Sequence, residues 1–197
     1  MTRGLILRNI PYSDSSRIIR CFTSESGIKA YFIRLSKNKK QTGHLQVGCF
    51  IEFQTKGTSN GITSITESRP DSAINQCELH PSLIGVWLFT IELLNKSLPE
   101  DFHVPGLSQA IDTYYTHLSH QSISAEPLIP LILISSKLGV HDPLTCEVEE
   151  KSTLAESLYL LNIQTTPSSV TNIKFLPTLH EFQLHFNIKR IESLYLL

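Results

Sequence analysis

Residues 17–35 read RIIRCFTSESGIKAYFIRL, and this stretch decides the fold of the N-terminal half. Its two arms, 17–23 and 28–35, are rich in β-branched and aromatic residues, and the connection at 25–27 ends in glycine. This pattern predicts a β-hairpin, because such side chains suit a pleated surface and glycine permits a tight turn.

Three further strands are expected around this hairpin. Residues 5–7 form a short strand before a loop-forming segment at 9–14, and strands at 49–56 and 61–67 are joined by residues 57–60. Five short strands in about 65 residues suit a small closed barrel, and the OB-fold has this number of strands.

Beyond Pro70 the spacing of apolar residues becomes helical, and Pro99 and Gly139 are expected to end two of the helices. The expected helices span 83–98, 107–120, 129–138 and 152–161, with two short helices in 178–197 broken near Asn187. The fold class is therefore predicted as α+β, because strands come first and helices follow. We expect an N-terminal five-stranded OB-fold barrel at 1–70, binding nucleic acid, followed by an all-α helical domain at 71–197 that docks proteins.

The formal net charge of −1 conceals two opposed halves. Residues 1–69 hold eleven Lys and Arg against four Asp and Glu, a net charge of +7, and residues 70–197 hold six against fourteen, a net charge of −8. A basic half favours a polyanionic ligand, which the near-neutral average would hide.

The sequence also predicts a cytoplasmic protein. No signal peptide is visible after Met1, and the most apolar run, Leu128–Leu138, is too short to span a bilayer, which needs about 20 residues. The four cysteines are widely spread rather than arranged as a disulfide framework.

Basic and aromatic side chains are interleaved over the expected barrel strands and in the Lys-rich segment 37–43. Cations bind phosphates through counterion release, and aromatic rings stack on bases at roughly 1–3 kcal/mol each. Phe22, Phe32, Phe50 and Phe53 are mostly expected in the barrel core, whereas Tyr12 is expected to stack. The candidate DNA-binding residues are Arg8, Tyr12, Arg17, Arg20, Lys29, Arg34, Lys37, Lys39 and Lys40.

No motif supports catalysis or a cofactor. The chain lacks a glycine-rich phosphate loop, a Gly-x-Ser-x-Gly elbow and a His-Glu-x-x-His motif. His117 and His120 have a spacing that permits chelation on a helix, but there is no Cys-x-x-Cys, so we expect no metal site. The protein is predicted not to be an enzyme and to need no cofactor.

Residues 7–16, LRNIPYSDSS, followed by Phe22, Thr23 and Gly27, resemble the opening of the bacterial RecO family of DNA repair proteins. Weaker similarity continues through 91–94 and the closing segment. The resemblance implies an OB-fold on a helical domain that binds single- and double-stranded DNA and anneals complementary strands. It also implies partners: RecR, with which RecA is loaded, and single-stranded-DNA-binding protein, at the nucleoid.

One departure from the family pattern concerns zinc. Many members carry four zinc-binding cysteines in the helical domain, whereas only Cys146 stands near that place here. The resemblance therefore implies a helical domain without an intact zinc module.

The residues alone leave other functions open. An OB-type RNA-binding protein has the same phosphate and stacking requirements, since only the 2′-hydroxyl distinguishes the two polymers at a given contact. A scaffold whose basic half docks an acidic protein is a second alternative, and an unrecognised hydrolase is a remote third.

Overall fold

The computed structural model describes residues 1–35, 43–59, 61–72, 79–121, 123, 125–140, 147–149, 161, 166–168 and 175–193. The chain forms two compact units. The first comprises Met1–Glu78 together with Leu98–His103, and the second comprises Leu79–Ser97 together with Val104–Leu197.

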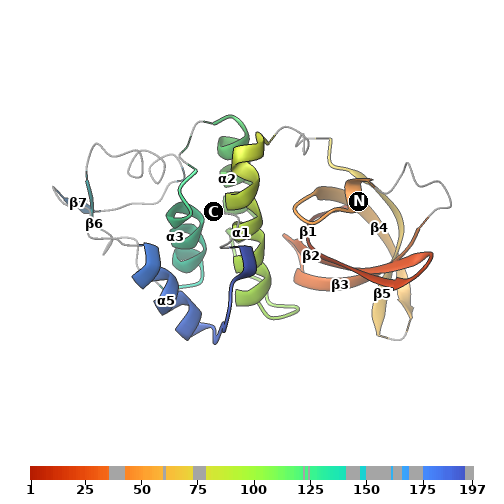
Figure 1. The fold of residues 1–197 in the computed structure, drawn as a ribbon. Coiled ribbons are helices and arrows are strands. Elements are labelled where there is room, and N and C mark those ends of the chain that lie inside the picture. The colour runs from red at the N-terminus through yellow and green to blue at the C-terminus, as the bar shows by residue number, and fades with distance from the viewer. Residues whose placement is uncertain are drawn as a thin grey trace. The chain divides into compact units, whose positions relative to one another are not determined.

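The first unit is a closed barrel of five strands in the order β1-β2-β3-β5-β4. These strands are labelled in Figure 1. Its strands are β1 (Thr2–Ser13), β2 (Ser16–Thr23), β3 (Gly27–Arg34), β4 (Phe50–Ser59) and β5 (Ile62–Pro70). Neighbours pair antiparallel except β3 and β5, which pair in parallel. The predicted five-stranded OB-fold barrel is confirmed, as is the hairpin, whose Gly27 has a φ of 64°.

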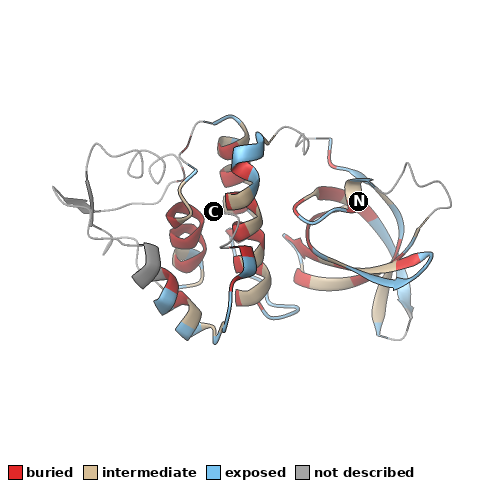
Figure 2. Cartoon of the chain, viewed as in Figure 1, coloured by how far each residue is buried: buried red, intermediate tan, exposed pale blue. Residues whose placement is uncertain are grey.

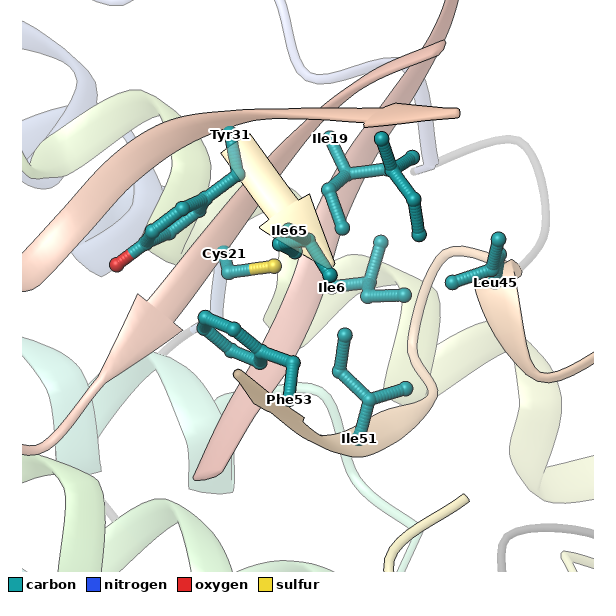
Figure 3. Close-up of a cluster of buried hydrophobic side chains, with 9 residues drawn as sticks. Ile6, Ile19, Cys21, Tyr31, Leu45, Ile51, Phe53 and Ile65 are labelled. Atoms are coloured by element: carbon teal, nitrogen blue, oxygen red, sulfur yellow. The ribbon is translucent and has the colours of Figure 1, made fainter. Parts of the chain in front are cut away.

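The barrel interior is filled by alternate residues of every strand (Figure 3). Ile6, Ile19, Ile51 and Phe53 have no exposed surface. Cys21 lies among them, and burial raises the pKa of its thiol. Tyr31 packs edge-to-face on Phe53 with ring centroids 4.9 Å apart, and burial raises its pKa to about 12. Leu45, from the 3₁₀ turn Gly43–Leu45, joins this cluster.

The prediction of a loop at residues 9–14 is wrong, because β1 continues to Ser13 and the turn occupies only Asp14 and Ser15. Pairing with β2 holds this extension, although its register shifts twice. Pro11 is tolerated because the backbone hydrogen bonds of β1 on the β4 side end at Ile6 among the described residues, which places Pro11 on a sheet edge.

The predicted connection between the last two strands, residues 57–60, is also longer than the one in the structure. β4 continues to Ser59, and its register against β5 shifts between Lys56 and Thr58. Gly57 lies between them with a φ of 52°, so the glycine marks a bulge within the hairpin rather than its turn.

The second unit contains four α-helices among its described residues: α1 (Pro81–Ser97), α2 (Leu107–Ser119), α3 (Leu128–Lys137) and α5 (Phe175–His185). The first three confirm the predicted helices, and Gly139 follows α3 with a φ of 69°. α1 packs against α2 and α3, and α3 against α5. Figure 2 shows α3 almost wholly buried, and Trp87 of α1 meets Tyr115 of α2 with ring centroids 4.8 Å apart.

The C-terminal part differs from an all-helical expectation in one place. The three-residue strands β6 (Glu147–Glu149) and β7 (Thr166–Ser168) pair in parallel, which the sequence did not predict. The break expected near Asn187 is present, with α5 ending at His185 and Asn187 at a φ of 53°. Residues 192–193 have 3₁₀ conformation, and residues 194–197 of the second expected helix lie outside the described part of the chain. The helix expected at 152–161 lies outside the described residues except for Leu161.

Candidate nucleic-acid interface

Strand pairing places a row of side chains across the outer face of β1, β2, β3 and β5. Ile10 pairs with Ile18, Ile18 with Phe32, and Phe32 with Ser64. Directly opposite residues project from the same side of a sheet, and the alternate residues Ile19, Tyr31 and Ile65 belong to the interior cluster. The row therefore faces outward, and Ile10 is 40% exposed.

A groove of about 610 Å³ lies on this outer face. It is lined by Tyr12, Ile18, Phe32, Arg34, Ile62, Ser64, Ile65 and Thr66. Tyr12, which is 67% exposed, packs edge-to-face on Phe32 with ring centroids 5.8 Å apart. An exposed ring held by a second ring offers a flat apolar surface beside a cation, which suits a nucleobase with its phosphate.

The cations expected to bind DNA are not all on this face. Arg34 lines the groove and is exposed, and Arg8 is exposed on β1, two residues before Ile10. Arg17 pairs with the interior residue Ile33, so the Arg17 side chain leaves the sheet from the inward side. Arg17 is half-buried, and its Nη1 lies 3.5 Å from Asn9 Oδ1. Lys37, Lys39 and Lys40 lie outside the described residues.

Arg20 and Lys29 meet carboxylates from the segment Leu98–His103. Arg20 Nη2 donates a 3.2 Å hydrogen bond to the Leu98 carbonyl, and its Nε lies 3.8 Å from Glu100 Oε1. Burial lowers the pKa of Arg20, Glu100 raises it, and neighbouring Arg8 lowers it further. Lys29 Nζ lies 3.8 Å from Asp101 Oδ1. Neither acid was foreseen, because no local pattern links them to the barrel.

A second groove of about 450 Å³ shares Arg34 and Thr66 with the first. His44 and Ser68 line it and are hydrogen-bonded, with His44 Nε2 2.9 Å from Ser68 Oγ. Burial lowers the pKa of His44, so its ring favours the neutral form. Arg69 also lines the groove and pairs with Glu52, Nη2 to Oε2, at 2.6 Å. The shared residues make the two grooves neighbours along β3 and β5.

Most of the four barrel phenylalanines are buried as expected, but only one of them lies in the barrel core. Phe22, Phe50 and Phe53 are buried, although only Phe53 belongs to the interior cluster. Phe32 is the exception, because it faces outward and is only half-buried. Its neighbour Tyr31 occupies the interior instead, and two adjacent aromatic residues give no sequence signal of which one points inward.

No cluster of three or more His, Cys, Asp or Glu able to hold a metal ion occurs among the described residues. His117 and His120 lie at the end of α2, where His120 is exposed. Cys146 lies outside the described part of the chain. Among the helices that the structure describes, none is both long and apolar enough to cross a bilayer.

Residues 1–73 match the family described as "Recombination protein O N terminal". The barrel is a RecO N-terminal domain. The match ends within a few residues of Pro70, where β5 ends, so it covers the strands that carry both grooves.

Relatives named "DNA repair protein RecO" extend this similarity beyond the barrel. The Flavobacterium johnsoniae protein is 26% identical over 149 residues, covering 71% of this chain and 62% of the relative. The Flavobacterium psychrophilum protein is 24% identical over the same length, covering 61% of the relative. The Streptococcus mutans protein is 30% identical over 121 residues, covering 49% of this chain and 48% of the relative. The chain thus spans about three fifths of the length of the two Flavobacterium RecO proteins that it matches.

Proposed function

We propose that the barrel binds DNA on its outer face, as part of a protein of recombinational DNA repair. The observation that carries this proposal is the groove beside Tyr12, Phe32 and Arg34 on a RecO N-terminal barrel. Tyr12 offers a ring for stacking, and Arg34 and Arg8 offer charges for phosphates.

Charge supports the same face. The net charge of +7 over residues 1–69 draws a polyanion to the barrel, but several of its cations have carboxylate partners. Arg3 pairs with Asp71, Arg69 with Glu52, and Arg20 and Lys29 with residues of 98–103. Exposed Arg8 and Arg34, together with Lys37, Lys39 and Lys40, are therefore assigned the main phosphate contacts, and Arg17 a peripheral one.

The finer role follows what the resemblance to the RecO family implies. Binding of single- and double-stranded DNA, annealing of complementary strands, and loading of RecA together with RecR are proposed for this chain, without enzymatic turnover or a cofactor. The part after residue 70 is assigned to protein docking, with RecR and single-stranded-DNA-binding protein as its partners at the nucleoid. A strand-annealing assay with and without single-stranded-DNA-binding protein tests this role.

Reversal of charge on the outer face tests the DNA interface itself. Arg8→Glu and Arg34→Glu should each weaken binding of a fluorescent oligonucleotide, and each should flatten the plot of log affinity against log salt concentration. Loss of one phosphate contact reduces the slope by roughly 0.7 for a single strand and 0.9 for a duplex. Lys137→Glu, at an exposed position ending α3, is the matched control and should change the slope less.

Equal slopes for all three variants and the unmodified protein would refute the assignment of this face. An RNA competitor of the same sequence separates the proposal from RNA binding. DNA should displace the labelled oligonucleotide at a lower concentration than RNA does, because a site built for RNA would use the 2′-hydroxyl.

A further inference from the structure

The segment Leu98–His103, here called the strap, returns to the barrel and runs beside β3. β3 pairs with β5 only over Tyr31–Ile33, so β5 leaves the edge of residues 27–30 uncovered. There Ile28 and Glu100 form a parallel bridge, and the Asp101 N–H donates a 2.8 Å hydrogen bond to the Ile28 carbonyl. The strap thus extends the sheet by one bridge at an edge that would otherwise be open.

The hairpin turn before β3 is shaped to admit the strap. A Cβ added to Gly27 would lie 2.1 Å from the Phe102 carbonyl oxygen, and the φ of Gly27 is 64°. The close approach of the two backbones therefore requires glycine at this position.

The strap brings two carboxylates to two cations of the barrel. Glu100 lies 3.8 Å from Arg20, and Asp101 lies 3.8 Å from Lys29. The side chains of both acids remain largely exposed, at 59% and 71%. Exposed pairs at this distance add little stability, so the charges are poorly explained as a structural bond.

The position of Arg20 connects the strap to the DNA face. Arg20 pairs directly with Arg8 across β1 and β2, and the two side chains project from the same side of the sheet. Ala30 continues this row on β3 beside the row that contains Phe32. A phosphate bound at Arg8 would therefore lie close to Arg20, where the Glu100 carboxylate now stands.

We propose that the strap is an autoinhibitory element whose Glu100 carboxylate competes with DNA phosphates for Arg20. Lys29 pairs with the interior residue Cys21, so it leaves the sheet from the inward side, and its pair with Asp101 lies off the DNA face. This inference rests on the proposed function of the barrel. With the strap in place, DNA contacts the exposed residues Arg8, Tyr12 and Arg34 but not Arg20. When a phosphate displaces Glu100, Arg20 adds one further contact, so that DNA is held more tightly.

The test removes the charge of Glu100 and keeps the shape of the strap. The variant Glu100→Gln leaves the backbone bridge to Ile28 and the hydrogen bond from the Asp101 N–H intact. It should bind a single-stranded oligonucleotide roughly three- to tenfold more tightly at low salt. The salt slope should steepen by up to about 0.7, for the one cation released.

The matched control changes the net charge equally, at an exposed acid of the same unit. Glu25→Gln should give a smaller gain and a smaller change in slope. A double-mutant cycle then localises the effect. In an Arg20→Gln background, Glu100→Gln should lose its gain, because the cation that it releases is gone.

The outcomes separate this inference from the proposed function. If the strap variant equals the control while Arg34→Glu still weakens binding, the inference is wrong and the DNA face stands. If neither the unmodified protein nor any variant binds DNA at low salt, the proposed function is wrong and the inference falls with it. A gain by Glu100→Gln that persists without Arg20 also overturns the competition for that cation.

Discussion

Gly27→Ala tests whether the strap is seated on the barrel, independently of any DNA. An alanine there carries two penalties. The φ of 64° costs an L-residue about 1–2 kcal/mol, and the added Cβ would meet the Phe102 carbonyl oxygen at 2.1 Å. Because that atom belongs to the backbone, the strap must move away from β3.

Gly61→Ala separates the two penalties. Gly61 has a φ of 79°, so alanine is strained there as well, but nothing lies within 4 Å of its added Cβ. The excess cost of Gly27→Ala over Gly61→Ala therefore measures displacement of the strap. Loss of the hydrogen bond from Asp101 to Ile28 alone predicts an excess of about 1 kcal/mol, and loss of the bond from Arg20 to Leu98 raises it to about 2 kcal/mol.

The assay must report the barrel rather than the helical unit. Trp87, the single tryptophan, lies on α1 in the second unit, so its fluorescence does not follow the barrel. Hydrogen exchange of the β2 and β3 amides gives barrel stability, and exchange of the Asp101 amide gives the opening of the strap. Gly27→Ala should speed exchange at Asp101 roughly tenfold or more, since 1.4 kcal/mol is a factor of ten. Equal costs for the two glycine variants, with Asp101 protected in both, would show that the strap is not seated as described.

Three further predictions concern the groove, a carboxylate clamp and the barrel core. Tyr12→Ala should weaken single-strand binding by roughly 1–3 kcal/mol per stacked base. Val47→Ala, at another exposed apolar position, should leave the affinity unchanged. Oligonucleotide titration of both variants checks the stacking role. Glu92 accepts hydrogen bonds from the backbone N–H groups of Glu192 and Ser193, both at 2.6 Å, and pairs with Lys96. Burial raises the pKa of Glu92, but these bonds outweigh it and lower the pKa overall. Glu92→Gln should therefore destabilise the helical unit at any pH above the ordinary carboxyl pKa of about 4.3. The difference in stability from the wild type should vanish as pH falls through the lowered pKa, because wild-type Glu92 is then protonated too. Urea titrations followed by Trp87 fluorescence test the sign, and a difference that grows in acid would contradict it. Phe53→Ala, at a fully buried position, should cost about 3–5 kcal/mol in barrel stability, and exchange of the Ile6 amide checks it.

The sequence by itself determined the barrel strands and the first three helices. Alternation in residues 17–35 and a glycine at 27 specify a hairpin locally, and Pro99 and Gly139 mark helix ends by their backbone chemistry. It also placed Tyr12 on the surface and Phe53 in the barrel core, but it did not separate Phe53 from Phe22 and Phe50, which are buried outside that core.

Tertiary structure decided which face of each strand points outward and which cations remain for a ligand. Tyr31 and Phe32 are adjacent aromatic residues, and only the register with β2 and β5 sends the first inward and the second to the groove. Arg20 and Leu98 are 78 residues apart, so no local pattern could show that the strap meets the barrel. Local periodicity specifies elements, whereas ion pairs between distant segments depend on the path of the whole chain. For that reason the sequence located the basic half, and only the fold separated Arg8 and Arg34 from the cations that the strap occupies.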